Sequence, residues 1–209
     1  MSRVATQQTL KTCVYRDVAA LSGVDADAAL MIRLRDGDKE SFTRLLDKHR
    51  GPVINFLYRM VQSHSAAEEL AQEVFLRVYR SRNSYEPTAK FTTWLFRIAT
   101  HLALNWIRDG QKERGQQSLD AHHQAGGARQ VKDRSLNAEQ KLLEAARLDE
   151  VRRAIQLLPP KQRAAVLMHK YEELEYSQIA VVLGCTESAV KSLLFRAYET
   201  LRVRLAHFR

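Results

Sequence analysis

The sequence is poor in the features that mark exported, disulfide-bonded or membrane-spanning proteins. It has two cysteines, Cys13 and Cys185, without a CxxC or Cys/His ligand spacing, so we interpret both as free thiols. No segment approaches the roughly 18 uninterrupted apolar residues of a membrane span. The first residues also lack the apolar core and cleavage site of a signal peptide. We therefore expect a cytoplasmic protein.

Residues that break helices are also scarce. Only 4 prolines and 8 glycines interrupt the chain, and apolar residues recur at helical spacing rather than in alternation. This pattern predicts an all-α fold with two small helical domains joined by a flexible linker, because residues 110–138 contain hardly any large apolar residue. The expected units are an arm over 1–24, a first domain over 25–109, a linker over 110–139 and a second domain over 140–209. In the first domain we expect helices near 26–35, 38–61, 66–81 and 91–109.

Clusters of catalytic or metal-ligating residues are missing too. His122 and His123 lie side by side in the expected linker, but no further ligands stand at usable spacing, so we predict no metal and no cofactor. No carboxylate cluster, Ser/His/Asp set or P-loop has a suitable spacing. We expect no catalytic residues, no small-molecule substrate and no enzymatic activity.

Charge is plentiful and unevenly distributed. The net charge is +9 and the sequence pI is 9.8, which points first to nucleic acid as a partner. Residues 67–73 are acidic without a basic residue, whereas residues 76–108 carry six basic residues against one acidic residue. Opposite charges separated along the chain indicate two partners of opposite charge.

Residues 176–202, "YSQIAVVLGCTESAVKSLLFRAYETLR", predict a helix-turn-helix. Ser177 can cap the first helix, Gly184 supplies a left-handed turn, and Thr186 can cap the second helix. The second helix carries Lys191, Ser192, Phe195 and Arg196 together, and these side chains suit phosphates, base edges and thymine methyl groups. The alternative is a helical hairpin packed on another protein.

The segment before it, "LPPKQRAAVLMHKYEEL", predicts a supporting helix. We expect Leu157, Ala164, Leu167 and Met168 to point inward. Lys161 and Arg163 are then free to contact backbone phosphate.

Two segments of the first domain carry outward faces with a distinct character. In the helix near 66–81, a leucine stands among acids and an amide on the outer face, which suits docking on a basic helical partner: Glu69, Gln72, Glu73 and Leu76. In "KFTTWLFRIATHLALNWIRD", a polar and basic ladder opposes an inward face that includes Trp94: Thr93, Arg97, His101, Asn105 and Arg108. With the polar loop 81–90 ahead of it, which carries Tyr85, this ladder suits unstacked single-strand bases.

At these residues the chain resembles the extracytoplasmic-function (ECF) sigma factors of the sigma-70 family. "AEELAQEVFLRVYR" is similar to the family's polymerase-binding helix, "FTTWLFRIATHLALNWIRD" to its −10 segment, and "LPPKQRAAVLMHKYEEL" with the helix-turn-helix to its −35 reader. The likeness spans about 25–109 (region 2) and 140–205 (region 4). His101 and Leu193 depart from the family, which commonly has Asn and Arg there.

The resemblance implies a protein that binds core RNA polymerase through the β′ clamp and β flap, recognises −35 and −10 promoter DNA and promotes strand opening. It also implies an anti-sigma factor, which can hold the chain at the inner membrane. The polymerase-binding residues would be Glu69, Leu70, Gln72, Glu73 and Leu76. The −10 residues would be Arg82, Asn83, Tyr85, Lys90, Arg97, His101, Asn105 and Arg108. The −35 residues would be Lys161, Arg163, Thr186, Glu187, Ser188, Lys191, Ser192, Phe195 and Arg196.

Two other classes remain open from the residues themselves. A helix-turn-helix repressor or activator would bind duplex DNA without polymerase, but the acidic segment followed by an aromatic and basic one argues against it. An enzyme acting on nucleic acid would need a catalytic cluster that the sequence does not offer.

Overall fold

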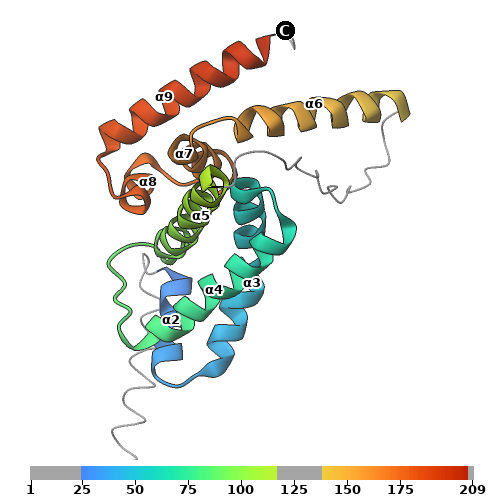
Figure 1. The fold of residues 1–209 in the computed structure, drawn as a ribbon. Helices are drawn as coiled ribbons and strands as arrows, with labels where there is room; N and C mark the ends of the chain where they lie inside the picture. The colour runs from blue at the N-terminus through green and yellow to red at the C-terminus, as the bar shows by residue number, and fades with distance from the viewer. Residues whose placement is uncertain (1–24, 117–137, 207–209) are drawn as a thin grey trace, which may run out of the picture.

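A computed structural model describes residues 25–116 and 138–206, and these residues form helices and no strand (Figure 1). The all-α prediction is therefore confirmed. The arm 1–24, including Cys13, and the pair His122 and His123 lie outside the described residues. The elements in chain order are α2 (Ala26–Arg35), α3 (Lys39–Val61), α4 (His64–Arg80), the 3₁₀ turn η1 (Ser81–Asn83), α5 (Phe91–Gln116), α6 (Ala138–Gln156), α7 (Pro160–Tyr171), α8 (Tyr176–Leu183) and α9 (Glu187–Arg204).

Helix boundaries follow the local capping chemistry. The Thr186 side chain accepts a hydrogen bond from Ala189 N–H, and Gly184 adopts φ 63° after α8, so both predictions are confirmed. The predicted cap at Ser177 is wrong. Glu175 precedes α8 instead, and it forms a reciprocal capping box with Gln178.

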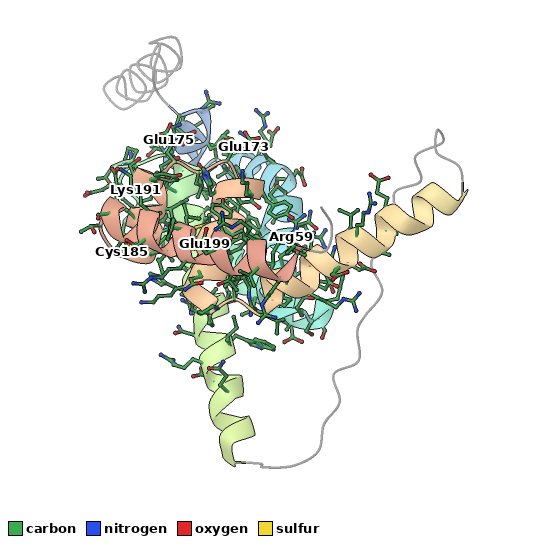
Figure 2. The ribbon with its side chains drawn as sticks, turned by 90° about the horizontal axis from the view of Figure 1, so that it is seen from above. Arg59, Glu173, Glu175, Cys185, Lys191 and Glu199 are labelled. Carbon is green, nitrogen blue, oxygen red and sulfur yellow. The ribbon has the colours of Figure 1, made fainter. Side chains whose placement is uncertain are left out.

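Helix α5 is longer than predicted, because it continues to Gln116 instead of ending near 109. The added stretch, "GQKERGQ", contains two glycines, but its glutamines, lysine, glutamate and arginine are good helix formers. The last turns of α5 project away from the other helices (Figure 2), and so does the N-terminal part of α6 (Figures 1 and 2).

Each half of the chain buries its own apolar residues. Helices α2 to α5 enclose Phe56, Leu57 and Leu95, whereas Met168 and Ile179 are buried in the second half. The inward placement predicted for Leu157 is wrong: its side chain is 61% exposed and Leu158 is buried instead. The reason is that α6 ends at Gln156, so helical periodicity no longer decides which side chain faces the core.

The two helical units also pack against each other. Helix α5 lies beside α8 and α7, and α3 lies beside α7 (Figure 1). A single apolar cluster runs through both units. The Gln156 side chain donates a 2.6 Å hydrogen bond to the Arg59 carbonyl, and the Thr100 hydroxyl lies 3.9 Å from Met168 Sδ.

Membrane-spanning potential is low within the described helices. None of them alone has the length and apolar character to cross a bilayer, and the pair α8 and α9 passes that test only jointly, across a 98° bend.

Candidate nucleic-acid interface and partner groove

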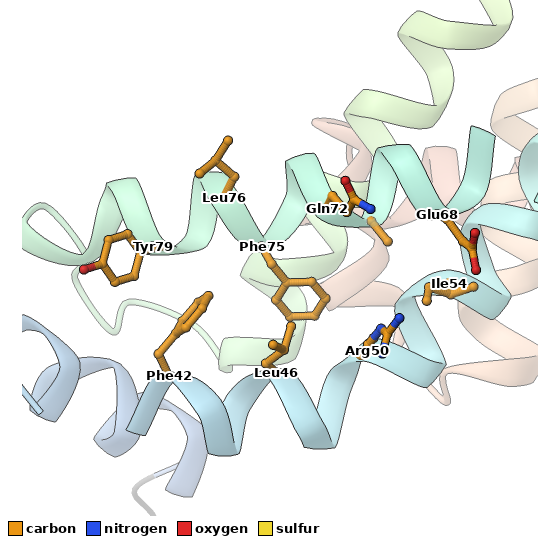
Figure 3. A pocket seen from close by; sticks show the side chains of 10 residues that line it. Phe42, Leu46, Arg50, Ile54, Glu68, Gln72, Phe75, Leu76 and Tyr79 are labelled. Carbon is orange, nitrogen blue, oxygen red and sulfur yellow. The ribbon is translucent and has the colours of Figure 1, made fainter. Parts of the chain in front are cut away.

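An apolar groove of about 630 Å³ runs between α3 and α4 (Figure 3). Helix α3 contributes a side chain at every fourth position, and α4 contributes the facing wall. The lining residues are Phe42, Leu46, Arg50, Ile54, Glu68, Ala71, Gln72, Phe75, Leu76 and Tyr79. Sequence reasoning missed the α3 wall, although Phe42, Leu46 and Ile54 form a second apolar stripe beside the core stripe of that helix.

The predicted polymerase-binding residues lie on and next to this groove. Gln72 and Leu76 line it, and Leu76 is 42% exposed. Glu69 is exposed beside them, and Glu73 is half-buried in a 2.7 Å ion pair with Arg77. Leu70 packs partly against the core. The result is an open apolar channel with carboxylates along one edge.

A polar and basic ladder runs along the outer side of α5. Arg97, His101, Asn105 and Arg108 are all exposed on this helix. Lys90 is exposed at the end of the preceding loop. Four cationic or polar side chains in helical register present hydrogen-bond donors to whatever lies along α5.

The first part of the loop 81–90 contacts the end of α4. Asn83 is exposed, but Arg82 is half-buried: it donates a 2.9 Å hydrogen bond to the Tyr79 carbonyl and stacks 4.3 Å from the Tyr79 ring. Arg82 therefore braces the loop in this arrangement and does not extend from it.

Tyr85 lies beneath the loop, where a base cannot reach it. Its side chain is 4% exposed, and its ring meets the Trp94 ring edge-on at 5.0 Å. Burial, followed by the negative charges of Asp25 and Asp27, raises the pKa of Tyr85 to about 12. In this arrangement Tyr85 is buried and does not face DNA as predicted. Trp94 packs against the core, as expected.

Thr93 also departs from its expected place on the outer face. It is 1% exposed, because Gln178 of α8 covers it and donates a 3.1 Å hydrogen bond to its hydroxyl oxygen. The ladder on α5 is therefore free beyond its first turn, and its beginning is covered by the second unit.

The recognition face of α9 is open to solvent. Lys191, Ser192 and Arg196 are exposed, and the apolar ring of Phe195 is 68% exposed among them. Figure 2 shows Lys191 near the start of this helix. Glu187 and Ser188 are exposed in the first turn, which Thr186 caps. Leu193 packs partly against the core, so its departure from the family pattern extends the apolar face.

Arg163 is not free for phosphate as predicted. Its guanidinium donates a 2.6 Å hydrogen bond to the Met60 carbonyl at the end of α3, and it also donates to the carbonyls of Gln156 and Leu158. Burial lowers the pKa of Arg163. Its neighbour Lys161 is exposed, as expected. Arg163 thus joins the two helical units, which no local sequence pattern could have indicated.

A second polar contact lies next to Arg163. The Arg59 guanidinium stacks 4.0 Å from the Tyr171 ring, which links α3 to the end of α7. Burial raises the pKa of the adjacent Glu172 to about 7, while the charge of Arg59 opposes this rise. Across the described ranges, no group of three or more His, Cys, Asp or Glu side chains is placed to hold a metal ion.

Comparison with known families agrees with this geometry. The sigma-70 region 2 model matches residues 45–113, and the sigma-70 region 4 model matches residues 148–201. The chain is 31% identical to the RNA polymerase sigma-H factor of Pseudomonas aeruginosa, over 85% of this chain and 92% of that protein. The chain belongs to the ECF sigma factors of the sigma-70 family.

Further relatives of this sigma factor agree in sequence and fold. It is 30% identical to the ECF RNA polymerase sigma-E factor of Escherichia coli, over 84% of this chain and 92% of that one. Two solved structures share its fold: CnrH in complex with the cytosolic domain of CnrY (TM-score 0.64, 19% identity, 88% of this chain and 99% of that one), and RpoE in complex with the anti-sigma factor NepR from Bartonella quintana (TM-score 0.65, 21% identity, 81% and 99%). The chain is an RNA polymerase sigma factor, and the reading as a regulator that acts without polymerase is not favoured.

Proposed function

We propose that this sigma factor docks on the β′ clamp of core RNA polymerase through the groove between α3 and α4 and its acidic edge. An apolar channel flanked by carboxylates fits an amphipathic helix with basic flanks. Gln72 and Leu76 would contact that helix inside the groove, and Glu69 and Glu73 would meet its basic residues. Leu70 supports the face from the core side.

The two DNA-reading surfaces are the ladder of α5 and the open face of α9. Arg97, His101, Asn105 and Arg108 follow the opened −10 strand, with Asn83 and Lys90 at the loop. Lys191, Ser192, Phe195 and Arg196 read the −35 duplex, and Lys161, Glu187 and Ser188 lie at its edge. Residues 25–109 and 140–209 act as the two functional units, and the chain supplies binding free energy without an active site.

The two packed units must separate before the chain can bind both promoter elements. The −35 and −10 elements are separated by something on the order of 50 Å, about one and a half turns of duplex at ~34–36 Å each. Because α8 packs on the first turn of α5, the two DNA-reading surfaces cannot move apart to that separation while this contact persists. The residues between Gln116 and Ala138 can extend to roughly 70 Å at ~3.3–3.6 Å each, which permits the separation.

An anti-sigma factor is the partner that would hold the packed form. RpoE of Bartonella quintana, which shares the fold, was solved with the anti-sigma factor NepR, and CnrH was solved with the cytosolic domain of CnrY. This partner would keep the chain inactive in the cytoplasm or at the inner membrane. If the chain purified from its own cells never carries an inhibitor under repressing conditions, this part of the proposal is wrong.

The exposed Phe195 between Lys191 and Arg196 is the observation that carries the DNA-binding role. The test measures binding of a −35 duplex and a −10 non-template single strand by fluorescence anisotropy, with and without core polymerase. We expect single-strand binding to appear only with core present. A protein that binds duplex equally well without core, and yields no transcript with it, would be a regulator that acts without polymerase.

A further inference from the structure

One carboxylate serves the N-termini of two helices. Asp25 Oδ1 accepts a 3.1 Å hydrogen bond from the backbone N–H of Asp27 and so caps α2. Asp25 Oδ2 accepts from the backbone N–H of Phe91, the first residue of α5, although the two residues stand 66 positions apart. The first N–H groups of a helix have no partner within the helix, and a negative charge there is favourable.

Helix α5 depends on this distant acceptor, because its own sequence offers none at that point. Lys90, which precedes the helix, carries only hydrogen-bond donors in its side chain. The N–H of Phe91 is therefore satisfied from α2.

The start of α2 is itself firmly anchored. Asp27 is 4% exposed and accepts hydrogen bonds from Lys48 Nζ at 2.7 Å and 2.8 Å. Its second oxygen also lies 2.9 Å from His49 Nε2, and the His49 ring lies 5.3 Å from the Phe91 ring. Asp25 therefore connects the hydrogen-bonded contact between α2 and α3 to the point where the loop 81–90 enters α5.

We propose that Asp25 is a positioning residue for strand capture: it fixes the junction between the loop 81–90 and α5, so that both hold the opened −10 strand. This inference rests on the proposed function of that loop and ladder. Asp25 does not contact DNA in this scheme. It acts because residues 86–90 are all exposed, so the loop has little packing of its own on this side.

The decisive variant is Asp25→Asn in the full-length chain. Asparagine has one acceptor oxygen and a donor amide, so it can cap α2 but cannot also accept from Phe91. The matched control is Asp38→Asn, the same change at the cap of α3. There the carboxylate accepts from Glu40 N–H and from the Ser41 hydroxyl, which can reverse and accept from the amide.

The assay uses holoenzyme on a promoter mapped with the wild-type protein. Permanganate reactivity of −10 thymines reports opening, and anisotropy reports core affinity and −35 duplex binding. We expect Asp25→Asn to lower the opening equilibrium about tenfold, in line with the loss of one hydrogen bond to a charged group. Core affinity and −35 binding should stay close to those of Asp38→Asn. Thermal stability should fall modestly below that of this control, because the bond to Phe91 is also lost from the folded chain.

Each other outcome overturns a stated claim. If Asp25→Asn opens the promoter as well as the wild-type protein does, Asp25 has no positioning role. If core affinity and −35 binding fall in the same ratio as opening, the residue is only structural. If the wild-type holoenzyme opens no promoter, the proposed function fails and takes this inference with it.

Discussion

Arg163 offers the sharpest test of how the two units are joined. As a phosphate contact it would need only its positive charge, which lysine preserves. As a link between the units it needs a planar group that reaches carbonyls of Met60, Gln156 and Leu158 together. Lysine lacks this fork geometry. The pair of variants Arg163→Lys and Arg163→Ala therefore separates the two roles.

The expected loss follows from those three hydrogen bonds. A hydrogen bond to a charged group contributes about 1.5–3 kcal/mol. The 3.3 Å bond to Leu158 is weak, and the guanidinium is not fully buried, so we take the lower end for the other two. Arg163→Ala should then cost about 3 kcal/mol. At roughly 2–4 °C per kcal/mol for a chain of this size, the melting temperature should fall by about 6–12 °C.

The assay combines thermal unfolding with the salt dependence of −35 duplex binding. We expect Arg163→Lys to lose about 2 kcal/mol of stability, because one ammonium group keeps only part of the contacts. Neither variant should change the salt slope, whereas the control Lys161→Ala should flatten it by about one unit without loss of stability. A stable Arg163→Lys together with a flattened slope in Arg163→Ala would mean that Arg163 binds phosphate after all.

Three further predictions address the remaining surfaces. Glu73→Lys should abolish core binding while the helical fold persists, because the lost ion pair with the arginine four residues on costs less than about 1 kcal/mol. Asp149→Lys, which breaks an exposed ion pair with the arginine three residues on in α6, should bind core normally. Equal binding by both variants would remove the acidic edge from the interface. Arg196→Ala should weaken −35 binding and flatten its salt slope by about one unit if the guanidinium meets a phosphate, and an unchanged slope would assign it to a base or to no contact. The pKa of Glu172 is raised from 4.5 to about 7 chiefly by burial, with Arg59 opposing, so the folded state holds the extra proton and stability should fall as pH rises from about 4.5 to 7. Glu172→Gln should remove that fall in melting temperature, and an identical pH profile in both proteins would show that Glu172 does not titrate there.

Local sequence pattern was sufficient to predict the helices and their outward faces. The pattern of the second helix correctly predicted that Phe195 and Arg196 face outward on α9, and Val190, Leu194 and Ala197 are buried on its other side. Helical periodicity relates residues three and four apart, so it fixes faces within one helix reliably.

Pattern was insufficient where a distant segment covers a face. Thr93 belongs to the polar side of α5 by spacing, yet α8 covers it in the folded chain. By its sequence context Arg163 resembles a surface cation, but the carbonyl groups that it contacts stand 5, 7 and 103 positions away. The bond between Asp25 and Phe91 is equally non-local. Such contacts depend on tertiary packing, which periodicity does not encode.

The most direct measurement is run-off transcription by purified core polymerase over a genomic library, with and without this chain, followed by mapping of the 5′ ends. A sigma factor with two separate DNA-reading units should produce a defined set of new start sites that share two short elements at fixed spacing, and Glu73→Lys should erase that set. Identical transcripts with and without the chain would contradict the role assigned to it.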